Sequence, residues 1–327
     1  MYYKGSIPIL AAPCILKPVI TFLFDLDGVI YRDREPVPGA AEAVAGLRAD
    51  GHAILFATNN ATHGRQEFVE RLAAVGVPAE LDQIATSASA TAAYLHQLPR
   101  PPATTLVVGA PSLAAELEAV GIRVTRASDN GDLGEQPDCV VASLDRQISY
   151  PRLAQAQAAV LAGASLIATN RDPQFPGAQG RLWPGAGSIV AAIETASRTT
   201  ATVIGKPGPL LYQTLLRAHG IDPRRVIVVG DNLETDIPGA MALNLASVLV
   251  LTGISTRAEL ATSAAKPTLV VETLTELLHR DLEELVADIV PETQMARIVT
   301  DDTDGSAEKG DTGESPSMTG AIPGNHP

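Results

Sequence analysis

The stretch VITFLFDLDGV at residues 19–29 places two carboxylates directly after a short apolar run. Val19 to Phe24 are mostly β-branched or aromatic, as is typical of a buried parallel strand. The run stops at Asp25, Asp27 follows, and Gly28 permits a turn that brings both acids to one side. Like charges this close repel by about 1 kcal/mol at 4 Å in water and about 4 kcal/mol at an effective dielectric near 20. We therefore expect a cation beside them.

The same pattern of an apolar run followed by a polar residue recurs along the chain. Ala53 to Ala57 ends at Thr58, and Val226 to Val229 ends at Gly230-Asp231. Stretches with helical periodicity separate these runs, and this alternation predicts an α/β fold, a Rossmann-like doubly wound parallel sheet. Ligands of such sheets bind beyond the carboxyl ends of the strands. We therefore expect Asp25, Thr58 and Asp231 to meet in one crevice.

A proline cluster at 98–102 (LPRPP) indicates a linker. A second series of alternating strand and helix patterns follows, and core-type strands resume at Ala201 to Ile204. Residues 101–200 are therefore predicted to form an inserted α/β cap domain, here called the cap segment. The remaining predictions are a leader at 1–18, a core at 19–100 and 201–280, and an acidic tail at 281–327 with a composition typical of disorder.

Charge and composition argue against several classes of protein. With 24 Lys and Arg against 37 Asp and Glu, the net charge is −13, which argues against a nucleic-acid partner held by a broad basic face. The two cysteines lie far apart, which fits a reducing, cytoplasmic compartment better than a disulfide scaffold. Prolines interrupt the apolar leader well short of a membrane-spanning length, and Pro13 stands where a signal cleavage site would have a small residue. We predict no membrane partner.

The polar residues after the predicted strands form a chemically coherent set. Asp231 and Asp236, in GDNLETD, add two carboxylates to the first pair, and such oxygen-rich sites suit Mg²⁺. Lys206 offers a point positive charge, and Thr58 and Asn59 offer neutral donors. A metal, a cation, donors and a nucleophile are what phosphoryl transfer needs.

Each of these motifs taken alone has an ordinary structural interpretation. Asp-Leu-Asp-Gly is a common acidic turn, Lys206 could be a surface lysine, and Asp236 could cap the following helix. Their occurrence together, in order, each after a predicted strand, favours the functional interpretation.

The four motifs, in this order, resemble those of the haloacid dehalogenase superfamily. They are Asp25-Leu26-Asp27-Gly28-Val29, Thr58-Asn59-Asn60, Gly205-Lys206-Pro207 and Gly230-Asp231-Asn232 with Thr235-Asp236. The resemblance runs from about Phe22 to Leu278 and is closest to the NagD-like or 4-nitrophenylphosphatase branch, which includes pyridoxal, phosphoglycolate and glycerol-3-phosphate phosphatases. That branch carries an inserted α/β cap.

The resemblance implies a role for each motif residue. Asp25 would be the nucleophile that becomes an aspartyl-phosphate, and Asp27 would be the general acid and base. Asp25, the backbone carbonyl of Asp27 and Asp231 would hold Mg²⁺, with Asp236 holding a metal-bound water. Thr58 and Asn59 would bind phosphoryl oxygens, and Lys206 would neutralise charge.

The sequence of the cap segment indicates functional residues less clearly than the core motifs do. Asn170-Arg171-Asp172-Pro173 is consistent with a plain turn, and Asp145, Arg146 and Arg181 are more simply solvated than bound to substrate. Gly185-Ala186-Gly187 lacks the third glycine of a dinucleotide loop, because Val190 stands there, and we expect it to start a close-packed helix. Two stretches depart from the family pattern outside the proposed catalytic groups, Ser143-Leu144-Asp145 and Ala242-Leu243-Asn244.

The function expected from this set is hydrolysis of a small phosphorylated metabolite. Phosphoglycolate, glycerol phosphate, pyridoxal phosphate and sugar or nucleotide phosphates stay open as substrates. The alternatives are a catalytically silent binding or regulatory protein on the same fold and a dehalogenase, which has no use for an acid at Asp27. Relatives often dimerise through the cap, so a homodimer stays open too.

Overall fold

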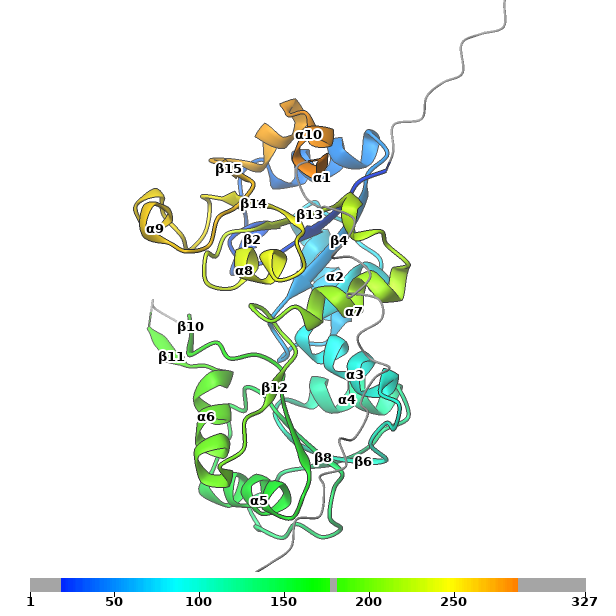
Figure 1. Cartoon of the computed structure of the whole chain (residues 1–327), viewed down its shortest axis with the longest axis vertical. Coiled ribbons are helices and arrows are strands. Elements are labelled where there is room, and N and C mark those ends of the chain that lie inside the picture. The colour runs from blue at the N-terminus through cyan, green and yellow to red at the C-terminus, as the bar shows by residue number, and fades with distance from the viewer. Residues whose placement is uncertain (1–18, 177–180, 288–327) are drawn as a thin grey trace, which may run out of the picture. The chain divides into compact units, whose positions relative to one another are not determined.

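The structure is a computed structural model that describes residues 19–176 and 181–287 (Figure 1). The predicted leader and most of the predicted tail lie outside these residues. The described chain contains two parallel sheets, each covered by helices, and this confirms the prediction of an α/β fold.

The larger sheet has six parallel strands in the order β15-β14-β13-β1-β4-β5. The chain runs outward from the central β1 through β4 to β5, and later returns on the other side of β1 through β13 to β15. In sheets of this kind ligands bind where the strand order reverses, which is here at the carboxyl ends of β1 and β13. The strands are β1 (Thr21–Phe24), β4 (Ala53–Thr58), β5 (Ile84–Thr86), β13 (Val226–Gly230), β14 (Ala246–Val250) and β15 (Leu269–Val271).

Helices cover both faces of this sheet. Side chains along each strand alternate between the two faces, so each strand packs against helices on both sides. In β1, Phe22 and Phe24 pack toward α1, α2, η4 and α10, whereas Leu23 packs toward α3, α7 and α8. Both faces are buried, which explains the continuous apolar run in the sequence. The helices are α1 (Ala40–Ala49), α2 (Arg65–Ala74), α3 (Ser87–Gln97), α7 (Leu210–His219), α8 (Asp236–Met241), α9 (Arg257–Thr262) and α10 (Leu282–Ala287). Short 3₁₀ turns are η1 (Leu81–Gln83), η3 (Pro223–Arg225) and η4 (Leu274–His279).

The smaller sheet has five parallel strands in the order β12-β9-β8-β6-β7 and comes mostly from the cap segment. Its elements are β6 (Thr104–Val108), α4 (Pro111–Ala119), β7 (Arg123–Arg126), β8 (Cys139–Ala142), α5 (Tyr150–Leu161), β9 (Ser165–Ala168), α6 (Ala186–Ser197) and β12 (Thr202–Val203). The sequence assigned residues 201–204 to the resumed core, but β12 pairs with β9 instead. An isolated apolar run does not reveal which sheet edge it will join.

One apolar cluster joins the two sheets. Val107, Val141 and Ile167 on one face of the smaller sheet pack, through α3 and α4, in the same cluster as Leu23 and Leu55 of the larger sheet. The other face of the smaller sheet packs under α5 and α6, which lie side by side in Figure 1. The cap segment is thus held to the core by buried apolar contacts as well as by its two chain crossings.

Three smaller features complete the described chain. Two antiparallel pairs occur, β2 (Tyr31–Arg32) with β3 (Glu35–Pro36) and β10 (Gln174–Pro176) with β11 (Leu182–Pro184). The structure differs from the predicted start of the tail, since α10 is helical and its Val286 is buried against the core. No helix among the described residues is long and apolar enough to span a bilayer.

Candidate active site

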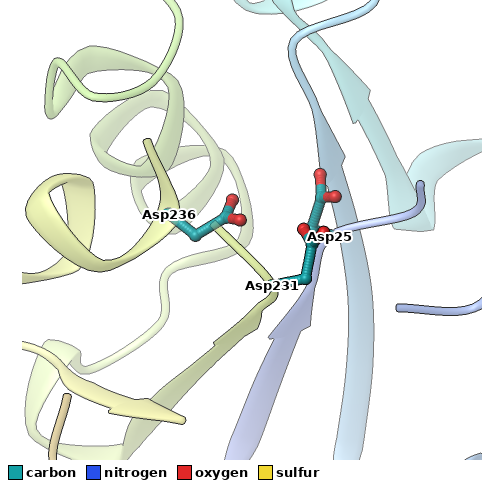
Figure 2. Close-up of side chains that lie close together, drawn as sticks. All are labelled: Asp25, Asp231 and Asp236. Carbon is teal, nitrogen blue, oxygen red and sulfur yellow. The ribbon is translucent and has the colours of Figure 1, made fainter. Parts of the chain in front are cut away.

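Asp25 and Asp231, which were predicted to share one crevice, lie where β1 and β13 of the larger sheet end. The backbone N–H of Asp25 donates to the Val229 carbonyl at 2.8 Å, so Asp25 directly extends the β1–β13 pairing. Asp231 follows β13, and Asp236 begins α8. Figure 2 shows the three side chains gathered, with the Asp236 carboxylate directed toward Asp25.

Gly28 makes the turn after β1, as the sequence predicts. Its φ is +83°, a region that L side chains rarely adopt. A Cβ at this position would stand 2.3 Å from Oδ2 of Asp231. Glycine is therefore required both for the backbone conformation and for the space of a neighbouring acid.

Lys206 lies beside Asp25, one of the two acids next to which the sequence predicts a cation. Its Nζ donates to Asp25 Oδ1 at 2.5 Å, to Asp236 Oδ1 at 2.6 Å and to the Ala57 carbonyl at 3.2 Å. Lys206 and Asp236 are almost fully buried, and the Asp25 side chain is 11% exposed. The ammonium thus bridges two carboxylates in a nearly water-free setting.

One ammonium does not balance this cluster. Burial raises the pKa of Asp25 well above its usual range; Lys206 opposes this, and Asp236 and Asp231 add to it. Burial and Asp236 also raise the pKa of Asp231, to about 7. Burial lowers the pKa of Lys206, but Asp236 and Asp25 more than reverse this, so that pKa lies well above its usual value. The site is short of positive charge.

The carboxylates fit a divalent cation. Ligand oxygens of Asp25, Asp231 and Asp236 all lie within 4.8 Å of one another. Three clustered carboxylates with excess negative charge are a donor set that suits Mg²⁺. Among the described residues, no other group of three His, Cys, Asp or Glu is arranged in this way.

Asp27 differs from the other acids because it is exposed to solvent. Protein atoms around its carboxyl group nevertheless desolvate it and raise its pKa, while the Arg71 guanidinium lowers it. Arg71, on α2, lies over the Tyr31 ring at 5.4 Å from the centroid. No motif singles out Arg71, because it lies on α2, far from Asp27 along the chain, and only the fold brings the two together.

Thr58 ends β4 and is buried, and its Oγ1 accepts the Asn60 backbone N–H at 3.2 Å. The neighbouring Asn59 is placed differently from a simple phosphate ligand. Its Oδ1 accepts the Lys206 N–H at 2.8 Å, and its Nδ2 donates to the Lys206 carbonyl at 2.9 Å. The side chain of Asn59 therefore clamps the backbone of Lys206.

The loop after β14 also contributes to the site, and the sequence reasoning missed it. The Ile254 backbone N–H donates to Asp231 Oδ2 at 2.7 Å. A Cβ on Gly253 would stand 1.7 Å from the same oxygen. The available signal was a glycine shortly after the apolar run ASVLVL at 246–251.

The arrangement defines a class of protein: a hydrolase with a carboxylate at the end of the first strand, a buried lysine and a metal-binding acid set. The family profile described as haloacid dehalogenase-like hydrolase matches residues 22–123, and the HAD-hydrolase-like profile matches 203–277. The chain belongs to this family, as the resemblance in its motifs implied.

Several characterised proteins are similar over most of the chain. Human glycerol-3-phosphate phosphatase is 37% identical over 75% of this chain and 83% of its own length. Mouse chronophin is 39% identical over 72% of this chain and 82% of its own. The crystal structure of glycerol phosphate phosphatase from Mycobacterium tuberculosis in complex with magnesium superposes with a TM-score of 0.73, at 35% identity, over 83% of this chain and 79% of that one.

Proposed function

We propose that this chain is a Mg²⁺-dependent phosphatase that hydrolyses a small phosphate monoester through an aspartyl-phosphate on Asp25. The observation that carries the proposal is the buried contact of Lys206 with Asp25 and Asp236, beside Asp231. The relatives support the reaction class, since their names specify phosphatases of glycerol phosphate.

In the first step, an Asp25 oxygen attacks phosphorus and the bond from phosphorus to the leaving oxygen breaks. Asp27 gives its proton to that oxygen, a role that suits its raised pKa and its exposure to solvent. In the second step, Asp27 takes a proton from water as the water attacks phosphorus. The bond from phosphorus to Asp25 breaks, which releases inorganic phosphate and the free carboxylate.

Asp25, Asp231 and the backbone carbonyl of Asp27 would hold Mg²⁺, with Asp236 holding a water bound to it. The cation supplies charge stabilisation for the transferring phosphoryl group and offsets the excess of carboxylates. Lys206 keeps the Asp25 oxygen oriented and neutralises part of its charge.

Phosphate binding falls to Thr58 and Asn59, with a refinement for the latter. All of the hydrogen-bonding capacity of the Asn59 Nδ2 group is used by Lys206 and Asp172, and Oδ1 accepts from Lys206. We therefore assign the phosphate contact of Asn59 to its backbone N–H and the clamp on Lys206 to its side chain.

The substrate is a small phosphorylated metabolite, and glycerol phosphate is the first to test because it appears in the names of several relatives. The cap segment at 101–200 would limit access of large substrates. A cytoplasmic location and a homodimer through the cap segment complete the proposal.

The decisive experiment measures phosphate release from 4-nitrophenyl phosphate by the purified protein with Mg²⁺. We expect activity in the wild type, and its loss by about a thousandfold or more in Asp25→Asn, which keeps the shape but not the nucleophile. A matched control is Asp138→Asn, an exposed acid of the cap segment that should leave kcat unchanged. An active Asp25→Asn variant would contradict the nucleophile assignment, and an inactive wild type would favour a silent binding protein.

A further inference from the structure

The clamp between Asn59 and Lys206 has a third member, which comes from the cap segment. The Nδ2 group of Asn59 donates one hydrogen to the Lys206 carbonyl and faces both carboxylate oxygens of Asp172, at 3.2 and 3.3 Å. Only the NH₂ side of a carboxamide can face a carboxylate, because two oxygens would repel. Asp172 therefore favours the same orientation of the Asn59 carboxamide as the Lys206 backbone does.

The orientation of that carboxamide matters for Lys206. Oδ1 must face the Lys206 N–H and Nδ2 the Lys206 carbonyl, as they do here. A rotated carboxamide would oppose donor to donor and acceptor to acceptor. The backbone of Lys206 would then lose both bonds, and the Nζ bridge to Asp25 and Asp236 depends on that backbone.

The loop that carries Asp172 is itself held firmly. Asn170 Nδ2 donates to the Asn59 carbonyl at 2.8 Å, and Asn170 Oδ1 accepts the Asp172 N–H at 3.1 Å. The Asp172 carbonyl accepts the Gly187 N–H at 2.9 Å at the start of α6. A Cβ on Gly185 would stand 2.2 Å from that same carbonyl, so glycine is needed for this close approach.

These contacts give a joint role to two motifs that the proposed chemistry does not use. Asn170-Arg171-Asp172 is more than a plain turn, and Gly185-Ala186-Gly187 lets α6 approach it closely. Asp172 is largely shielded from water, and burial raises its pKa, with Asn59 and Lys206 opposing. Shielding a carboxylate from water costs free energy unless the carboxylate is paired and hydrogen-bonded, as Asp172 is with Asn59.

We propose that Asp172 is a positioning residue through which the cap segment orients Asn59 and thereby fixes Lys206 against the nucleophile. This inference rests on the proposed role of Lys206. Docking of the loop at 169–172 is then a condition for full catalytic rate, whichever substrate is bound.

The test compares Asp172→Ala with Asp172→Asn, whose carbonyl can still accept from Asn59. With Mg²⁺, we expect Asp172→Ala to lower kcat about tenfold, with KM changed less than about threefold, because small displacements of catalytic groups cost rate. Asp172→Asn should keep kcat within about threefold of the wild type. Melting temperatures and circular dichroism establish that each variant is folded.

Glu116→Gln is the matched control. Glu116 on α4 accepts from Arg65 on α2 at 2.9 and 3.1 Å, so it also joins the cap segment to the core without touching Asn59. We expect its kcat to stay within about twofold of the wild type. An equal loss in Glu116→Gln and Asp172→Ala would overturn the proposal in favour of general loosening of the cap segment.

Two further readouts separate positioning from contact with substrate. Asp172→Ala should reduce kcat by the same factor for 4-nitrophenyl phosphate and glycerol 3-phosphate, and it should add little in an Asn59→Ala background. An unaltered kcat in Asp172→Ala, or a full loss retained without Asn59, would overturn the proposal. Lys206→Met tests the underlying function separately, because an active Lys206→Met variant would remove the basis of both.

Discussion

Two clusters among the described residues place one cation between two carboxylates, and they differ in burial and in the balance of charge. In the crevice, Lys206 bridges Asp25 and Asp236, and all three are largely or fully buried. In the cap segment, Arg152 bridges Asp145 and Asp129 at 3.0 and 3.1 Å, and the Asp129 side chain is 65% exposed.

In the second cluster, groups of the protein itself hydrogen-bond and neutralise both carboxylates. The Gln147 N–H donates to Asp145, and the Ser149 hydroxyl donates to Asp129. This hydroxyl and Arg152 lower the pKa of Asp129, so its charge is favoured where it stands. In the crevice the pKa of Asp25 is raised, and its charge is not fully compensated. An ion cluster whose charges are balanced by protein groups supports structure, whereas one with excess negative charge favours the binding of a metal ion.

The largest expected difference comes from removing each cation in turn. Lys206→Met should lower kcat for 4-nitrophenyl phosphate by about a thousandfold, because the nucleophile loses its counter-charge. Arg152→Met should leave kcat within about twofold and reduce the free energy of unfolding by about 1–2 kcal/mol, since its hydrogen bonds are structural. Steady-state kinetics and urea unfolding measure the two effects. A comparable loss of kcat in both variants would contradict the assignment of a catalytic role to Lys206 and a structural role to Arg152.

A smaller effect should follow from adding one methyl group near each cluster. Gly28→Ala should lower kcat by about a hundredfold, because the new Cβ would displace Asp231. Gly131→Ala in the cap segment shares the positive φ, at +72°, but its Cβ would meet only Pro151 at 3.8 Å. It should cost about 1 kcal/mol of stability without loss of activity. Equal activity of the two variants would show that the space beside Asp231 is not needed.

The smallest expected effect is the dependence of the protein's stability on pH and on Mg²⁺. The pKa of Asp231 rises from 3.8 to about 7 on folding without metal, so between these values the folded protein binds more protons than the unfolded chain. Asp231 should therefore make the stability of the metal-free protein fall as pH rises from about 4 to about 7, and Asp25, whose pKa is also raised, acts in the same direction.

Mg²⁺ needs ionised ligands, so it should raise the melting temperature more at pH 8 than at pH 5.5. Differential scanning fluorimetry with EDTA or Mg²⁺ measures both trends, and Asp231→Asn should flatten them. A larger Mg²⁺ effect at the lower pH would contradict this account of the crevice.

Much of the site was readable from the sequence because it depends on strand ends. Asp25, Thr58 and Asp231 each follow an apolar run, and parallel strands bring such positions to one edge of the sheet. Gly28 was likewise readable, since a turn directly after the two acids favours a residue that tolerates positive φ.

Other features depended on contacts between distant segments. In α6, Val190 is buried whereas Ala192 and Ala196 are exposed, because α5 and the smaller sheet decide which side is covered. β12 joined the smaller sheet for the same reason. Local periodicity indicates that a helix or strand has a buried face, but the elements that pack against it determine which face that is.

The alternation of strand and helix patterns determined the fold class, and the strand ends located Asp25, Thr58 and Asp231. The family and the roles of Lys206 and Asp236 were inferred from the resemblance of the four motifs. Only the tertiary structure decided that the Asn59 side chain clamps Lys206, that Asp172 of the cap segment faces Asn59, and that one apolar cluster spans both sheets. The physical reason is that a hydrogen bond between residues 113 positions apart leaves no periodic trace in the chain. It exists only when the fold has brought the two side chains together.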